Sequence, residues 1–123
     1  MRQQDLPGDN GTGDSREKRV PRYVAVARIH EIPPGRSKVI REGDLQIALF
    51  NLGDIFYAID NICPHSGGPL SKGELQGEVV KCPWHGWQFN IKTGLSPIIP
   101  EVCVKTYQIR VEGGQVLVDL ESP

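Results

Sequence analysis

The chain has few cysteines, no long apolar run and almost no net charge. Three cysteines among 123 residues are too few for the disulfide framework of a small secreted domain. No stretch approaches the roughly eighteen apolar residues of a membrane-spanning helix, and the first residues are too polar for a signal peptide. A formal net charge of −1 indicates no basic surface for nucleic acid or anionic lipid. These absences favour a soluble, cytoplasmic protein with neither kind of partner.

Most of the chain is expected to form one domain that follows a tail. Residues 1–19 contain only two large apolar side chains, Met1 and Leu6, among glycine, polar and charged residues. Such a segment cannot bury enough apolar surface to offset its conformational entropy. We therefore predict a disordered tail over residues 1–21 and a single folded domain over residues 22–123.

From Tyr23 onward the sequence is typical of short strands separated by turns. No segment has sustained helical periodicity, and the 14 glycines and 10 prolines indicate frequent turns. Asn51-Leu52-Gly53-Asp54 and Gly113-Gly114 each predict a hairpin between two apolar-rich segments. The predicted fold is therefore all-β, an antiparallel sandwich or barrel with functional loops at one end. The segments predicted as strands are Tyr23–Ile29, Lys38–Arg41, Leu45–Phe50, Ile55–Ile59, Glu78–Lys81, Trp87–Asn90, Val104–Val111 and Gln115–Leu120.

Two short stretches each combine a cysteine with a histidine. They are Cys63-Pro64-His65 and Cys82-Pro83-Trp84-His85, and sixteen residues separate them. Together they supply two thiolate and two imidazole ligands, a set that either a zinc ion or an iron–sulfur cluster could use. In Cys₂His₂ zinc fingers the cysteines usually form one pair and the histidines the other. Here each pair is mixed, which favours a cluster, although structural zinc stays open.

Glycines follow both pairs, at Gly67-Gly68 and at Gly86. A glycine beside a ligand lets the backbone approach a bulky inorganic group and offer it N–H donors. With these glycines, the spacing of the four ligands resembles that of the Rieske [2Fe–2S] family, over roughly residues 22–120. The resemblance implies an all-β fold with a cluster-binding subdomain of two loops. It also implies a [2Fe–2S] cofactor whose ligands are Cys63, His65, Cys82 and His85.

A cluster with this ligand set favours electron transfer over catalysis. Two Fe³⁺, two sulfides and two thiolates sum to zero when both histidines are neutral, so one electron takes the centre to −1. An all-cysteine cluster would go from −2 to −3, and the mixed set therefore has the higher potential. The centre has no open coordination site for a substrate. A separate non-haem iron site would need two histidines and a carboxylate, and only His30 remains. We expect an electron carrier with no catalytic residues of its own.

The resemblance also indicates the kind of Rieske protein. Gly68 and Trp84 match the positions of the disulfide cysteines of respiratory Rieske proteins, so that disulfide is absent here. Trp87 and Phe89 match a serine and a tyrosine whose hydroxyls donate hydrogen bonds to cluster sulfur in those proteins. Fewer donors predict a potential toward the low end of the family's range. The chain is thus similar to soluble Rieske ferredoxins, which carry electrons from a flavin reductase to a terminal oxygenase of ring-hydroxylating dioxygenase systems. The alternative is the small Rieske-like subunit of an NAD(P)H-dependent nitrite reductase.

A few further residues carry expectations of their own. Ser96-Pro97-Ile98-Ile99-Pro100 matches the proline-rich loop that covers the cluster in the family. Trp84 is expected to shield the cluster, to form part of the docking surface, or simply to pack. Exposed edges of the ligand histidines are expected to form the docking surface. Cys103 lies between two valines and is expected to be a buried small hydrophobe, and His30 is expected at the surface.

Overall fold

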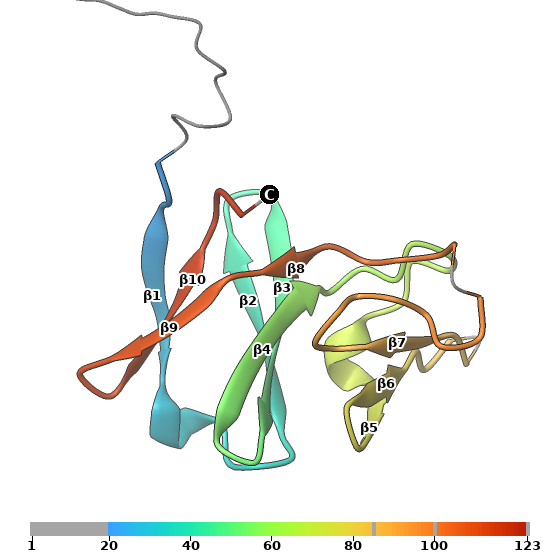
Figure 1. The fold of residues 1–123 in the computed structure, drawn as a ribbon, viewed down its shortest axis with the longest axis horizontal. Coiled ribbons are helices and arrows are strands. Elements are labelled where there is room, and N and C mark those ends of the chain that lie inside the picture. The colour runs from blue at the N-terminus through green and yellow to red at the C-terminus, as the bar shows by residue number, and fades with distance from the viewer. Residues whose placement is uncertain (1–19, 85, 100, 123) are drawn as a thin grey trace, which may run out of the picture.

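The structure is a computed structural model that describes residues 20–84, 86–99 and 101–122 (Figure 1). In this part of the chain the helical segments, η3 and η4, are single 3₁₀ turns, and none could cross a membrane. The predicted all-β class is confirmed, whereas the predicted tail, up to residue 19, lies outside the described residues. In chain order the elements are β1 (Tyr23–Arg28), η3 (Ile29–Glu31), β2 (Ser37–Glu42), β3 (Leu45–Leu52), β4 (Ile55–Asp60), η4 (Leu70–Lys72), β5 (Glu74–Gln76), β6 (Val79–Lys81), β7 (Gln88–Asn90), β8 (Thr106–Tyr107), β9 (Ile109–Glu112) and β10 (Gln115–Asp119).

The strands form three antiparallel sheets. One has the order β1-β10-β9 and the second the order β2-β3-β4-β8. These two sheets enclose the first hydrophobic core, which gives the sandwich that the sequence predicts. The third sheet, β5-β6-β7, is small and lies to one side, beside the loops that carry the Cys/His pairs (Figure 1).

Strand β3 is buried on both faces and separates two cores. Because side chains alternate along a strand, Ile47 and Leu49 enter the first core while Ala48 and Phe50 enter the second. All four side chains are at most 1% exposed. The uninterrupted apolar run Ile47–Phe50 is therefore explained by burial on both sides. The second core reaches into the small sheet and includes Cys63 and Cys82 themselves.

Both predicted hairpins are confirmed, and their turns explain why. Gly53 and Asp54 connect β3 to β4 with φ angles of 62° and 72°, and Gly113 and Gly114 connect β9 to β10 with φ angles of 58° and 76°. Two consecutive residues with positive φ match the right-handed twist of the flanking strands.

The segment Val104–Val111, predicted as one strand, instead forms two strands in different sheets. β8 pairs with β4, and β9 pairs with β10. The change occurs at Gln108, whose N–H is bound by the Ser122 hydroxyl at 2.9 Å and whose carbonyl accepts from the N–H of Asp119 at 3.0 Å. A sequence pattern records the alternation but not a change of partner. β5 was not predicted, because it is short and has a single apolar residue, Leu75.

Tyr107 links β8 to the end of β4, after which the chain enters the first of the two loops that carry the Cys/His pairs (the ligand loops). Its hydroxyl donates a hydrogen bond of 2.6 Å to Asp60 Oδ1. Burial of the ring, followed by this hydrogen bond and the carboxylate charge, raises the pKa of Tyr107 well above its usual range. The fold therefore favours the neutral phenol.

Replacing Tyr107 by Phe should lower the free energy of unfolding by about 1 kcal/mol at neutral pH, the usual contribution of one such hydrogen bond. The unfolded phenol ionises near pH 10. Because the folded pKa is higher, the contribution is complete below about pH 10 and is lost as the pH rises toward the folded pKa. Chemical denaturation at pH 7 and above pH 10 measures both effects. Tyr23→Phe, which keeps its ring under Arg110, is the control; equal losses in the two variants would contradict the assignment.

Candidate metal centre

The two cysteines of the Cys/His pairs lie in the interior of the protein. Cys63 follows β4 and Cys82 directly follows β6, and each is 1% exposed. Both side chains belong to the second core, together with Phe50, Val80 and Phe89. Their sulfur atoms are therefore shielded from bulk water by residues of three different strands.

The loop after Cys63 is closed by two backbone hydrogen bonds. The N–H of Cys63 donates to the carbonyl of Gly68 at 2.9 Å, and the N–H of Gly67 donates to the carbonyl of Cys63 at 2.8 Å. Gly67 has a φ of +80°, a conformation that side-chain-bearing residues rarely adopt. The glycine therefore allows the chain to fold back sharply around the cysteine.

The loop after Cys82 repeats this arrangement residue for residue. The N–H of Cys82 donates to the carbonyl of Trp87 at 2.7 Å, and the N–H of Gly86 donates to the carbonyl of Cys82 at 3.0 Å. Gly86, like Gly67, is the fourth residue after its cysteine and has a positive φ, of +76°. The two cysteines are thus presented by the same backbone frame, on two loops that are distant in sequence.

The two loops meet at Gly68. The Ser66 hydroxyl lies 3.3 Å from the Cys82 sulfur, and the N–H of Gly68 donates to the Ser66 hydroxyl oxygen at 3.2 Å. A β-carbon at position 68 would lie 2.8 Å from Cys82 Sγ and 2.9 Å from Cγ of the Trp84 ring. Only glycine leaves room for this approach. The positions that match the missing disulfide, 68 and 84, are therefore in contact here without a covalent bond.

The environment of Cys63 favours its thiolate. Burial raises the pKa of the thiol, but hydrogen bonds from the side chain and backbone of Ser66, the backbone of His65 and the Cys82 thiol outweigh it and lower the pKa. A thiolate is the form of cysteine that binds metals.

His65 lies at the surface beside the buried sulfur atoms. Its ring stacks on Trp87, with the ring centroids 4.0 Å apart and the planes inclined by 21°. The side chain is exposed, whereas Trp87 is half-buried. This first pair therefore has its cysteine inside and its histidine outside, as expected.

His85 lies outside the described residues. Among the residues that the structure does describe, no group of three or more His, Cys, Asp or Glu side chains is arranged to hold one metal ion. The described part of the predicted set consists of Cys63, His65 and Cys82. In a two-iron centre of the predicted kind the cysteines bind one iron and the histidines the other, so three ligands around a single ion are not required.

Exposed apolar side chains surround the second ligand loop. Trp84 is 59% exposed and Ile98 65% exposed. Gly86, Trp87, Ser96, Ile98 and Ile99 line a cavity of about 250 Å³. The Ser96 hydroxyl accepts the N–H groups of Ile98 and Ile99, which fixes this turn. The segment predicted to be the proline-rich loop thus lies beside the second ligand loop, as far as its described residues extend.

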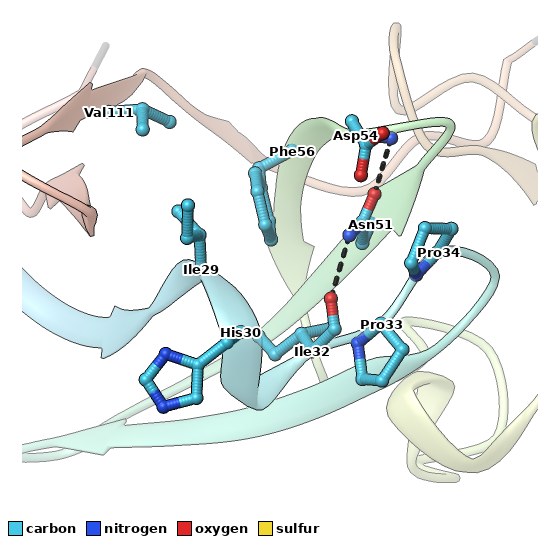
Figure 2. A pocket seen from close by; sticks show the side chains of 9 residues that line it. All are labelled: Ile29, His30, Ile32, Pro33, Pro34, Asn51, Asp54, Phe56 and Val111. Carbon is cyan, nitrogen blue, oxygen red and sulfur yellow. Dashed lines mark hydrogen bonds between the residues drawn. The ribbon is translucent and has the colours of Figure 1, made fainter.

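A larger cavity, of about 370 Å³, is lined by residues that do not belong to the loops carrying the Cys/His pairs (Figure 2). Its walls are mainly apolar and include Ile29, Phe56 and Val111. Its buried polar side chain, Asn51, is already used, because it donates to the Ile32 carbonyl at 2.7 Å and accepts the N–H of Asp54 at 2.7 Å. The hydrogen bonds of Asn51 therefore connect the turn before β4 to the backbone after η3.

The structure also shows where the other residues of interest lie, and it agrees with some predictions and not with others. His30 is exposed, as predicted, and Phe89 is a core residue with no exposed surface. The prediction for Cys103 was wrong, because this cysteine is exposed. It forms an isolated β-bridge with Leu95, which is itself exposed, so this pairing does not cover the Cys103 side chain. The hydroxyl of Ser66 was missed, since only the folded loops bring it to the sulfur of a residue sixteen positions away.

The comparisons with known proteins agree with this geometry. The family model described as Rieske [2Fe-2S] domain matches residues 22–108. Ferredoxin CarAc of Metapseudomonas resinovorans is 35% identical over 98 residues, which cover 78% of this chain and 92% of that protein. A solved complex of reduced oxygenase and oxidized ferredoxin in carbazole 1,9a-dioxygenase contains a chain that matches with a TM-score of 0.76 and 31% identity, covering 82% of this chain and 95% of that one. A putative NADH-dependent nitrite reductase small subunit from Mycobacterium tuberculosis matches with a TM-score of 0.78 and 26% identity, covering 85% and 100%.

The contact between Gly68 and Trp84 can be tested with a double-mutant cycle. Gly68→Ala should cost about 1–3 kcal/mol of unfolding free energy through overpacking. Part of that loss should disappear in Gly68→Ala/Trp84→Ala, because the indole ring is one of the two groups that the new β-carbon meets. Thermal and denaturant unfolding measure the coupling.

The neighbouring glycine supplies a matched control. Gly67→Ala strains a positive φ, but a β-carbon there would meet nothing within 4 Å. Its cost should therefore add to that of Trp84→Ala without coupling. If the losses of unfolding free energy in Gly68→Ala and Trp84→Ala were also additive, Trp84 would not be in contact with position 68.

Proposed function

The chain belongs to the Rieske [2Fe–2S] family, and on this premise we propose that it is a one-electron carrier of the ferredoxin type. It would receive electrons from a flavin-dependent reductase and deliver them to a terminal oxygenase. The observation that carries the proposal is the pair of buried cysteine sulfurs, presented by two identically hydrogen-bonded loops with His65 exposed beside them. The relatives named above as ferredoxins support the same role.

We assign Cys63, His65, Cys82 and His85 as the ligands of the cluster. The described residues fit this cofactor. Cys63 and Cys82 are buried together, hydrogen bonds favour the Cys63 thiolate, and Gly68 leaves space where a side chain would reach the Cys82 sulfur. When bound, a cluster of this type accepts and releases one electron.

The protein's own residues then have three tasks. The second core excludes water from the two sulfurs and packs the two cysteines against residues of β3, β6 and β7. Stacking on Trp87 fixes the orientation of the His65 ring. The exposure of His65 would give a redox partner a short path to the site.

Catalysis by this chain alone is not part of the proposal. Apart from the two proposed ligands, the sequence contains one histidine, His30, which is exposed and lies in η3 beside the larger cavity. A cytoplasmic location is part of the proposal, supported by a cysteine count of three, which is too low for a disulfide framework.

The small subunit of a nitrite reductase is the second candidate. It is favoured by the TM-score of 0.78 to the mycobacterial chain. The identity to that chain is 26%, against 35% to ferredoxin CarAc, and for this reason we favour the ferredoxin role. The two roles differ in the acceptor, which is an oxygenase in the first case and the large reductase subunit in the second.

Single substitutions of the proposed ligands test the cofactor assignment. Cys63→Ser and Cys82→Ser should each abolish stoichiometric iron and acid-labile sulfide and remove the visible absorption of the cluster. Cys103→Ser should keep all three, because the Cys103 side chain is exposed and is not part of the second core. Elemental analysis of anaerobically purified protein checks the result. Zinc without sulfide in the unmodified protein would instead favour a structural metal site.

Substitution of Trp84 tests whether this side chain belongs to the surface that docks a redox partner. Trp84→Ala should slow electron transfer to a cognate oxygenase about tenfold, the effect of about 1.4 kcal/mol at an aromatic contact residue. Its effect on the reduction potential should be much smaller. Stopped-flow mixing of the reduced protein with the oxygenase measures the rate. Val111→Ala, which removes part of another exposed apolar side chain on β9, should leave the rate unchanged; an equal decrease in both variants would remove Trp84 from the interface.

A further inference from the structure

Ser66 is the one described hydroxyl that the structure places on a ligand sulfur, and it comes from the opposite loop. It directly follows His65 in the first loop, and its Oγ lies 3.3 Å from the sulfur of Cys82 in the second. We propose that Ser66 tunes the reduction potential of the centre by donating a hydrogen bond to the Cys82 sulfur. This inference rests on the proposed function, because it requires Cys82 to be a cluster ligand.

The chemistry of the ligand decides the direction of the hydrogen bond. In the free protein either atom could be the donor. A cysteine bound to iron is a thiolate, which has no proton to donate, while a serine hydroxyl has one hydrogen and accepting lone pairs. Ser66 must therefore donate and Cys82 must accept once the cluster is in place.

The position of the Ser66 hydroxyl is also constrained from its other side. The N–H of Gly68 donates to Ser66 Oγ at 3.2 Å and so occupies an accepting site of the oxygen. The hydroxyl hydrogen is thereby left for the sulfur. Gly68 also keeps the space around Cys82 Sγ open, because a β-carbon there would approach the sulfur to 2.8 Å.

Ser66 supplies a hydroxyl hydrogen to the site. This single hydrogen can be donated to the Cys82 sulfur, which lies 3.3 Å from Ser66 Oγ. Trp87 and Phe89, the residues that match the hydroxyl donors of other family members, have no hydroxyl and occupy the stacked and core positions described above.

A donor to a ligand sulfur raises the potential because reduction adds negative charge to the centre. The hydrogen bond stabilises the more negative, reduced state more than the oxidised state. Removing the hydroxyl should therefore reduce the equilibrium constant for one-electron reduction roughly tenfold, which corresponds to about 59 mV. With the Ser66 hydroxyl present, the reduction potential should therefore be higher than the absence of hydroxyls at positions 87 and 89 alone would predict.

The experiment is a potentiometric titration of four purified, cluster-loaded variants against the unmodified protein. Ser66→Ala removes the hydroxyl. Ser66→Thr and Ser66→Val form a pair of similar shape that differs in the hydroxyl alone. Ser96→Ala is the control, because it removes another buried hydroxyl beside the second ligand loop that binds backbone N–H groups rather than sulfur. Iron and sulfide content are measured on each sample.

The expected result is a lower potential in Ser66→Ala and Ser66→Val, a potential near that of the unmodified protein in Ser66→Thr, and no shift in Ser96→Ala. Equal potentials for the Thr and Val variants, or an unchanged potential in a fully loaded Ala variant, would overturn the proposal. Failure of every hydroxyl-free variant to hold a cluster would also overturn it and make Ser66 a structural residue. Absence of a cluster from the unmodified protein is a separate result, which contradicts the proposed function itself.

Discussion

Burial of β3 on both faces is the constraint on which the site depends. The strand forms a wall of the sandwich core through Ile47 and Leu49 and a wall of the second core through Ala48 and Phe50. The second core in turn encloses Cys63 and Cys82. The loops that carry the two cysteines are therefore anchored to β3, a strand buried on both faces, which restricts the positions of the two sulfurs.

The two loops share one backbone frame but differ in the residues it presents. The second and third residues after the cysteine are His65 and Ser66 in the first loop, and Trp84 and His85 in the second. The register of the proposed ligand histidines thus differs by one residue between otherwise equivalent frames. In the first loop this register leaves Ser66 free to reach across to Cys82. The asymmetry of the motif, C-x-H against C-x-x-H, is what makes room for a hydroxyl at the sulfur.

Much of this architecture could be predicted from the sequence, because it depends on local patterns. Ligand spacing identified the family, and the glycine-containing turns at positions 53 and 113 fixed two hairpins. Features that depend on contacts between distant segments could not be predicted. The division of Val104–Val111 between two sheets is determined by the strands with which its two halves pair. The exposure of Cys103 depends on whether segments distant in sequence pack over it. The contact of Gly68 with Trp84 and the reach of Ser66 exist only after both loops have folded together.

The proposed function depends on two cysteines and two histidines that hold a two-iron cluster in this domain. The most direct measurement is an electron paramagnetic resonance spectrum of the dithionite-reduced protein, with iron quantified on the same sample. We expect a rhombic signal, from one unpaired electron per two irons, with the low average g value of mixed histidine and cysteine ligation. A signal with the higher average g of an all-cysteine cluster, or no signal from a protein with stoichiometric iron, would contradict it.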